Sequence, residues 1–368
     1  MKKKIKIGTY QNKSNRKKHY YLRLKDLENN VLMSGNPNFG KKKVLQNLLL
    51  EQPDIPFLLI TINKDFKLIK EKLDNVLILK PGIIFAINIF DSYGLNPYIY
   101  AQTIVECLSY YKNSKSDISP FSKYILGRIL ENIYKNQDLK DFDSFNDICA
   151  GIFDQNDKTI LKENEIEDLR KNNPLFLKRT IDLIRNSMKC SFKGKLKKIY
   201  TKKSSFDVEE LFSRNIILDL NSIFNFGGNI EDIIIFLCIL FIHIEDYKIR
   251  RKFTINEKNI NHFTILDNAQ IYKHNIIGNE IIKYWEIIAF YLRRRGECLV
   301  TISDDPLVSE DALFNNGVII SFKHSVDYLV LSEALNLKKE NKELIKSLDY
   351  GEFLLKTNSI PYPLLLNV

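Results

Sequence analysis

The sequence contains few cysteines, and they follow no pattern that would hold a metal ion or a disulfide framework. Five cysteines are scattered over 368 residues without a C-x-x-C pair, and the five histidines form no ligand-spaced cluster with them. A zinc site of the usual spacing and a small disulfide-stapled scaffold are therefore excluded. Scattered thiols also fit a reducing compartment, so we predict a cytoplasmic protein.

Long hydrophobic segments are missing as well. The longest apolar run, IIIFLCILFIHI at residues 233–244, is too short to span a bilayer. We interpret it as a buried helix and expect no membrane span. The basic N-terminus is not followed by an apolar segment, so we predict no signal peptide. Repeats and low-complexity segments are absent too, and 45% hydrophobic with 27% charged residues is an ordinary globular composition.

Positive charge is in excess. The formal net charge of +10 favours an anionic partner such as DNA, an acidic protein or a membrane surface, although an unspecific basic surface gives the same number. Residues 1–20 are densely basic, and the alternation in their KIKI segment predicts a short strand. Residues 178–203 are also basic, with Phe192 and Tyr200 interleaved. Each stretch is a candidate DNA contact, and a solvated terminus or helix face is the alternative.

The rest of the chain is organised around residues 31–50, VLMSGNPNFGKKKVLQNLLL. This stretch predicts an apolar strand, a turn and a helix that begins near Lys41. Gly35, Gly40 and Lys41 have the spacing of a phosphate-binding P-loop, G-x-x-x-x-G-K-[ST]. In such a loop, backbone N–H groups and the helix N-terminus surround phosphate oxygens. An ordinary strand–turn–helix with a chance Gly-Lys pair is the alternative. The candidate nucleotide-binding residues are Gly35, Asn36, Asn38, Gly40, Lys41 and Lys42.

Three positions in this loop depart from the pattern. Lys42 replaces the hydroxyl residue that holds Mg²⁺. Asn38 takes a place where glycine would be easiest, although asparagine tolerates a positive φ better than most residues. Phe39 brings a large ring to a point where we expect the loop to approach the nucleotide. We therefore expect binding of ATP and Mg²⁺ to be weak or lost.

Apolar runs that alternate with helix-like segments predict an α/β fold. Such near-continuous runs are typical of strands buried on both faces of a parallel sheet. We place these strands at 57–63, 76–82, 215–220, 262–266, 298–302 and within 312–323. The C-terminal part predicts a helix near 325–335, a charged helix near 338–347 and a closing hairpin at the sheet edge. The predicted divisions are a basic N-terminal arm or strand (1–25), a first part of the core (26–97), a helical insertion (98–204) and a second part of the core (205–368).

A second motif follows in HFTILDNAQIY at residues 262–272. Four residues of an apolar strand run into Asp267, which has the form of a Walker B strand whose aspartate holds the water shell of Mg²⁺. Asp267 is therefore the candidate metal residue. The next position, which usually carries a glutamate base, is Asn268, and an amide cannot accept the proton. Asp304 follows another strand and is either a turn residue or a substitute base.

The order of these motifs resembles that of the HerA/FtsK group of hexameric RecA-like DNA-pumping ATPases, especially its HerA-like branch. The resemblance covers most of the chain and rests on YLRLKDLENNVLMSGNPNFGKKK, FLLITINKDFKLI, LKPGIIFAINIFDSYGLNP, FSRNIILDLNSI, FTILDNAQ, RRRGECLVTISDDP and ALFNNGVIISFK. It implies a RecA-like P-loop NTPase core, with a mostly parallel sheet flanked by helices and a helical insertion. It further implies ATP and Mg²⁺ as cofactors, DNA as a partner, and either a homo-oligomer such as a hexameric ring or a complex with another protein.

The departures from this family fall on the residues that do the chemistry. By the resemblance, Lys42 stands at the Mg²⁺ hydroxyl, Asn268 at the catalytic glutamate and Asp304 at the sensor glutamine. The strand that often ends in arginine ends here in Lys323, and Arg293, Arg294 and Arg295 are candidates for an arginine finger acting across a subunit interface.

Three functions remain open at this point. The first is a HerA-like DNA-translocase subunit that is impaired in nucleotide binding or hydrolysis and acts in a DNA-associated oligomeric complex. The second is an active ATP-dependent translocase in which Asp304 stands in for the missing carboxylate. The third is a non-catalytic interaction module of a mobile-element or defence complex.

Overall fold

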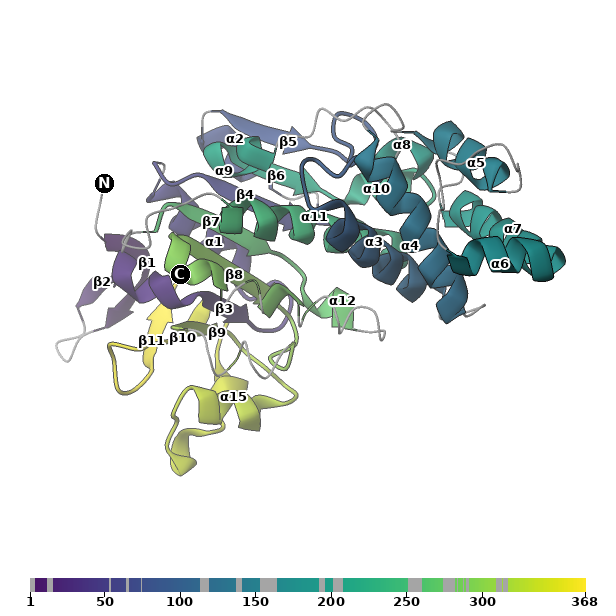
Figure 1. Ribbon diagram of the computed structural model, residues 1–368. Helices are drawn as coiled ribbons and strands as arrows, with labels where there is room; N and C mark the ends of the chain where they lie inside the picture. The colour runs from purple at the N-terminus through teal and green to yellow at the C-terminus, as the bar shows by residue number, and fades with distance from the viewer. Residues whose placement is uncertain are drawn as a thin grey trace. The chain divides into compact units, whose positions relative to one another are not determined.

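The structure is a computed structural model, shown in Figure 1. Two compact units are present. The first comprises Met1–Leu79, Asp207–Asn221 and His243–Val368, and the second comprises Lys80–Phe206 and Ser222–Ile242. The four-part division expected from the sequence stays a prediction. The structure describes residues 4–11, 16–52, 54–63, 66–73, 75–112, 119–136, 141–152, 164–191, 196–200, 208–250, 260–273, 282, 284–286, 288, 291–308, 313 and 317–368.

An 11-stranded sheet forms the first unit, in the order β2-β1-β11-β10-β9-β3-β8-β7-β4-β6-β5. Its strands are β1 (Lys4–Gln11), β2 (Lys17–Arg23), β3 (Val31–Ser34), β4 (Phe57–Thr61), β5 (Val76–Leu79), β6 (Asn215–Asp219), β7 (His262–Leu266), β8 (Glu297–Ser303), β9 (Val318–Ser321), β10 (Glu352–Thr357) and β11 (Leu364–Asn367).

The strands from β9 to β5 in this order all run parallel. Every residue of β3, β4, β7, β8 and β9 is buried, which explains why these strands could be found in the sequence as apolar runs. The predicted α/β fold with a mostly parallel sheet flanked by helices is confirmed.

The remaining strands extend the sheet in antiparallel fashion. β1 is the short strand predicted near the N-terminus, with Ile5 and Ile7 fully buried, and it pairs with β2. The closing hairpin, β10 and β11, also forms, but its predicted position at the sheet edge is wrong. β10 pairs with β9 and β11 pairs with β1, so the N-terminal hairpin covers it (Figure 1, yellow beside purple). β2 and β5 are the two outermost strands of the sheet.

The first helix, α1 (Lys41–Leu50), packs on the sheet through Val44, Leu45 and Leu48, which are fully buried in the main hydrophobic cluster. The other helical segments of the first unit are η1 (Leu24–Asn29), α2 (Lys67–Lys72), α9 (Val208–Ser213), α12 (Gln270–Lys273), η3 (Arg293–Arg295), α15 (Tyr328–Ala334), η4 (Lys339–Asn341) and α16 (Leu344–Ser347).

The single charged helix predicted near 338–347 is wrong, because the chain forms η4 and one turn of α16 there instead. The segment KKENKELIKS offers only two apolar residues, too few for the apolar stripe that a longer surface helix buries. Ile345 is fully buried and anchors the segment.

The second unit contains α3 (Pro97–Lys112), α4 (Pro120–Lys135), α5 (Phe142–Gly151), α6 (Asn164–Asn172), α7 (Pro174–Ser191), α8 (Lys197–Tyr200), α10 (Asn221–Asn225) and most of α11 (Ile230–Arg250). Its apolar positions at helical spacing are buried, for example Ile125, Ile129 and Ile133 of α4. The apolar run at 233–244 lies in α11, as predicted. Among the described helices, none is both long and apolar enough to cross a membrane.

The basic segment at 178–203 lies only partly within the described residues. Lys178 and Arg179 are exposed on α7, whereas Phe192 and the side chain of Lys189 lie outside what the structure describes. The proposed surface role of Tyr200 is wrong. Its ring is buried, and its hydroxyl donates to the backbone carbonyl of Asp232 at 3.0 Å.

Candidate functional site

A cavity of about 750 Å³ lies where β3, β4, β7 and β8 end and α1 begins. The carboxyl ends of parallel strands are the usual ligand position in open α/β sheets. The residues used below that line this cavity are Asn38, Gly40, Lys41, Lys42, Asn63, Asp267, Asn268, Gln270, Asp304 and Tyr350. Most of the predicted site residues are therefore brought together at one place, although they are far apart in the chain.

The turn between β3 and α1 has the backbone conformation that its sequence predicts. Asn38 takes a positive φ of 66°, and Gly40 has a φ of 125°. Gly35 is required by space as well, since a Cβ there would lie 2.4 Å from the Cβ of Phe322. The backbone N–H of Asn36 donates to the carbonyl of Lys323 at 2.8 Å, which ties the turn to the end of β9.

Phe39 does not fill the cavity, so the expectation that its ring would stand against the nucleotide is wrong. The ring packs against the main hydrophobic cluster, 6.5 Å from the ring of Tyr350. The Lys323 ammonium lies 5.8 Å from the centre of the Phe39 ring on another side. The loop can therefore turn its backbone, not this ring, toward the cavity.

The Lys41 side chain bends back under its own loop. Its ammonium donates to the carbonyls of Gly35 and Asn36, the latter at 3.0 Å, and forms an ion pair with Asp304 Oδ1 at 2.6 Å. Lys41 is only 8% exposed. Burial lowers the pKa of Lys41, and the carboxylate of Asp304 opposes this shift. Three ammonium donors thus have three partners within the protein.

Asp304 is held in place by Gln270. The amide of Gln270 donates to Asp304 Oδ2 at 3.1 Å, and its carbonyl oxygen accepts from the Asp304 backbone N–H at 3.1 Å. Asp304 was predicted to act as a sensor or a substitute base, and that role stays a prediction. Its observed partners are the Lys41 ammonium and the Gln270 amide. The sequence analysis did not single out Gln270.

Asp267 directly follows β7, the strand next to β8, and is 3% exposed. Its Oδ2 accepts from the hydroxyl of Thr61 at 2.8 Å and from the amide of Asn63 at 3.0 Å. Burial raises the pKa of Asp267, and these two hydrogen bonds and the charge of Lys42 work against that increase. Thr61 and Asn63 were missed by the sequence analysis, although the parallel position of their strand end could have indicated them.

Asn268 follows with a positive φ of 57°, and its side-chain amide lies 2.6 Å from that of Asn63. The position expected to hold the general base thus carries an amide packed against a second amide. Neither group can take a proton from water near neutral pH.

The residues around the cavity fit a magnesium ion poorly. Mg²⁺ requires oxygen ligands in near-octahedral geometry, usually supplied by a hydroxyl, a carboxylate, waters and phosphate oxygens. The helix opens with three lysines and no hydroxyl, and one oxygen of Asp267 already accepts two hydrogen bonds. Among the described residues, no group of three or more His, Cys, Asp or Glu side chains could hold a metal ion.

A buried histidine lies directly behind the loop. His324 Nε2 is 2.9 Å from the hydroxyl of Ser34, the last residue of β3. Burial and the nearby charge of Lys41 lower the pKa of His324 to about 4. The imidazole is therefore neutral at physiological pH and serves as a hydrogen-bonding support for the end of β3.

The triple arginine after Leu292 forms η3. The guanidinium of Arg295 donates to the backbone carbonyl of Lys248. This contact gives Arg295 a partner within its own chain. The arginine-finger role of Arg293, Arg294 and Arg295 stays a prediction.

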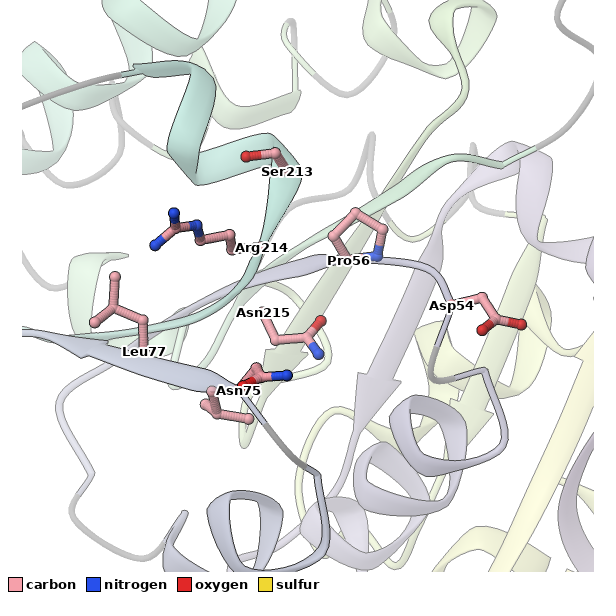
Figure 2. A pocket seen from close by; sticks show the side chains of 8 residues that line it. Asp54, Pro56, Asn75, Leu77, Ser213, Arg214 and Asn215 are labelled. Carbon is pink, nitrogen blue, oxygen red and sulfur yellow. The ribbon is translucent and has the colours of Figure 1, made fainter.

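A second pocket, of about 590 Å³, lies at the other end of the sheet (Figure 2). Its polar side chains come from the residues that precede or begin β4, β5 and β6, such as Asn75 and Asn215. Arg214 also borders it and pairs with Glu210 at 3.5 Å. Among the described residues, the lining contains neither a histidine nor a cysteine, and Asp54 is its one carboxylate. We therefore regard the cavity at Lys41 as the candidate site.

A parallel sheet, a P-loop-type turn after β3 and an aspartate at the end of β7 together define a RecA-like P-loop fold. Comparison with solved structures agrees. VirB4 of Thermoanaerobacter pseudethanolicus superimposes with a TM-score of 0.71 at 14% identity, covering 99% of this chain and 96% of that chain.

Plasmid coupling protein TrwB is also similar. Its complex with the non-hydrolysable GTP analogue GDPNP gives a TM-score of 0.60 at 9% identity, over 94% of this chain and 87% of that chain. Its complex with ADP and Mg²⁺ gives 0.58, also at 9% identity and with the same coverage. Likeness at this identity shows the shared fold. No protein-family model and no curated protein matches the sequence.

Proposed function

We propose that this protein is a nucleotide-binding subunit of the HerA/FtsK type that is deficient in hydrolysis and acts in a DNA-associated oligomeric complex. The observation that carries the proposal is the combination of a P-loop-type turn with an amide, Asn268, where the water-activating carboxylate is expected. TrwB, which shares the fold, has been solved with ADP and Mg²⁺ and with nucleotide analogues, and this supports a nucleotide as the ligand here.

DNA and a ring or hetero-oligomer belong to this proposal as well. The excess of positive charge and the description of TrwB as a conjugative coupling protein support DNA as the partner. The exposed basic strand β2, with Lys17 and Lys18, and the basic face of α7 are the surfaces we propose for it.

An active translocase is the second candidate, and Asp304 is the observation that bears on it. As a substitute base, Asp304 would have to accept a proton from water, but its oxygens face the Lys41 ammonium and the Gln270 amide. Both of its oxygens are therefore already engaged by partners within the protein. This geometry favours a hydrolysis-deficient subunit over an active translocase.

Nucleotide binding is tested by titrating purified protein with a ribose-labelled fluorescent ATP. We expect saturable binding, with Lys41→Ala weakening it by about tenfold or more because the loop loses its buried ammonium. Lys72→Ala is the matched control, since Lys72 is exposed on α2 and lies outside the cavity lining. Its effect should stay within about twofold. Absence of binding to the wild type would instead favour the non-catalytic interaction module.

A further inference from the structure

Lys42 stands in the first turn of α1, half-buried, on the wall of the candidate nucleotide cavity. Its charge acts on both acidic and basic neighbours: burial raises the pKa of Asp267 and the Lys42 charge opposes this increase, whereas burial lowers the pKa of Lys41 and the Lys42 charge adds to this decrease. The Lys42 ammonium is 5.8 Å from the centre of the Phe66 ring, which packs beside the end of β4. Lys42 is therefore a charged part of the site, and not only a solvated residue on the helix.

We propose that the site binds a nucleoside triphosphate without a divalent metal ion, because the Lys42 ammonium supplies the positive charge that a metal ion would supply. The ligand class is a nucleotide polyphosphate as the free anion. This inference rests on the nucleotide binding proposed above.

The aspartate of the cavity lies within the influence of the Lys42 charge. Asp267 is buried, and its side chain is held by Thr61 and Asn63. A divalent cation beside it would meet the charge of Lys42 in a cavity that water screens only in part, and like charges a few ångströms apart repel strongly there. Since the Lys42 charge already acts on Asp267, Mg²⁺ at this place would add two positive charges to the one that is there.

The basic side of the cavity explains why a second lysine is needed. The three donors of the Lys41 ammonium bond to two loop carbonyls and Asp304. Since phosphates must compete with these partners for Lys41, further positive charge for them is needed elsewhere in the loop. The helix N-terminus offers backbone N–H groups, and Lys42 offers a flexible ammonium that binds phosphate as a point charge.

Tyr350 adds a surface for the other end of the ligand. Its ring borders the same cavity and is 79% exposed, beside Phe39. An exposed aromatic face of this kind stacks on nucleobases with little preference among them. The proposed ligand therefore needs a base and a polyphosphate, but no metal ion.

The test is a titration of the full chain with ribose-labelled ATP in two buffers, one with Mg²⁺ and one with EDTA. We expect the wild-type dissociation constants in the two buffers to agree within about twofold. Lys42→Thr restores the hydroxyl of the P-loop pattern. We expect this variant to bind about tenfold more weakly in EDTA than the wild type, and to regain affinity with Mg²⁺.

Lys72→Thr is the matched control, since it removes one exposed lysine charge from α2, outside the cavity lining. It should behave as the wild type in both buffers. Wild-type binding that is about tenfold tighter with Mg²⁺ than with EDTA would overturn the inference and leave the proposed function standing. Failure to bind in both buffers would overturn both. The wild-type comparison needs no variant, so a folding defect in Lys42→Thr cannot hide the answer.

Discussion

Lys41 and Asp304 are separated by 263 positions in the chain and meet at the mouth of the P-loop-type turn. In this arrangement the carboxylate lies against the ammonium on which a phosphate-binding loop depends. An anion that binds at Lys41 must compete with a negative charge that is already there. We therefore expect this ion pair to stabilise the loop without a ligand and to lower the affinity for the proposed nucleotide.

Asp304→Asn is expected to strengthen nucleotide binding. The variant keeps the size of the side chain and removes the charge that competes with phosphate for Lys41. Since the Asp304 side chain is 33% exposed, we expect only about a fivefold lower dissociation constant, on the order of one partly screened ion pair. Fluorescent-ATP titration measures this effect.

Asp305→Asn is the control for that measurement, because Asp305 pairs with Lys273 at 3.2 Å and not with the loop lysine. It should leave the affinity close to that of the wild type. Weaker binding by Asp304→Asn would show that Asp304 contributes to the bound state, and the competing role would have to be abandoned.

At the scale of elements, strands β7 and β8 carry a group of polar side chains at each end, and the two groups differ in composition. At their carboxyl ends lie Asp267 and Asp304, which belong to the cavity. At their amino ends, Glu297 is fully buried with one oxygen 2.7 Å from His262 Nδ1 and the other 2.9 Å from the Lys248 ammonium. The hydroxyl of Thr264 donates to Glu297 at 2.7 Å. This network joins α11 to two central strands.

Glu297→Gln is expected to destabilise the protein strongly, because it leaves Lys248 buried without its carboxylate. Loss of one partner of a buried ion pair costs about 3–5 kcal/mol. Denaturant unfolding measures the difference. Glu210→Gln breaks the exposed pair with Arg214 and should change the unfolding free energy by less than about 0.5 kcal/mol.

Glu297 also makes the free energy of unfolding depend on pH. Burial by itself would raise the pKa of Glu297, but the charges of His262 and Lys248 outweigh it and lower this pKa from 4.5 to about 2. The stabilisation is then fully present above pH 4.5 and is lost as the pH falls toward 2. The difference in unfolding free energy between the wild type and Glu297→Gln should therefore become smaller over that range. An equal difference at pH 3 and pH 7 would contradict the lowered pKa of Glu297.

The elements that could be predicted from sequence are the buried strands, because their consecutive residues are mostly apolar. β4 (Phe57–Thr61) is buried at every residue, and all of its residues before Thr61 are apolar. The turn at Gly35 and Gly40 could be predicted because glycine is needed where Phe322 approaches. The position of the closing hairpin inside the sheet could not be predicted, because an apolar pattern does not identify the strand with which it pairs.

The site was predictable only in part, for a related reason. Asp267 and Lys41 follow recognisable local patterns, so each could be found without its neighbours. The partners that decide their electrostatics, Gln270 and Thr61 among them, are ordinary polar residues that gain meaning from the fold. The direction of the Phe39 ring also depends on the tertiary packing near Tyr350.

At the scale of the whole molecule, both units belong to the shared fold, since the similarity to VirB4 extends over 99% of this chain. The architecture of the P-loop core is therefore kept while the positions expected to perform hydrolysis carry Lys42 and Asn268. This combination is what we expect of a subunit that binds nucleotide to set its conformation or its assembly. Turnover would then belong to another component of the complex.

Phosphate release from ATP, measured with and without duplex DNA in the presence of Mg²⁺, tests this account most directly. We expect no turnover above background from the wild type. We expect detectable turnover from the double variant Lys42→Thr/Asn268→Glu, which restores both the metal hydroxyl and the base; the loss of a general base typically costs about 10²–10⁴-fold in rate. Lys41→Ala placed in that double variant should remove the gain. DNA-stimulated turnover by the wild type, abolished by Lys41→Ala, would contradict the account and identify an active translocase.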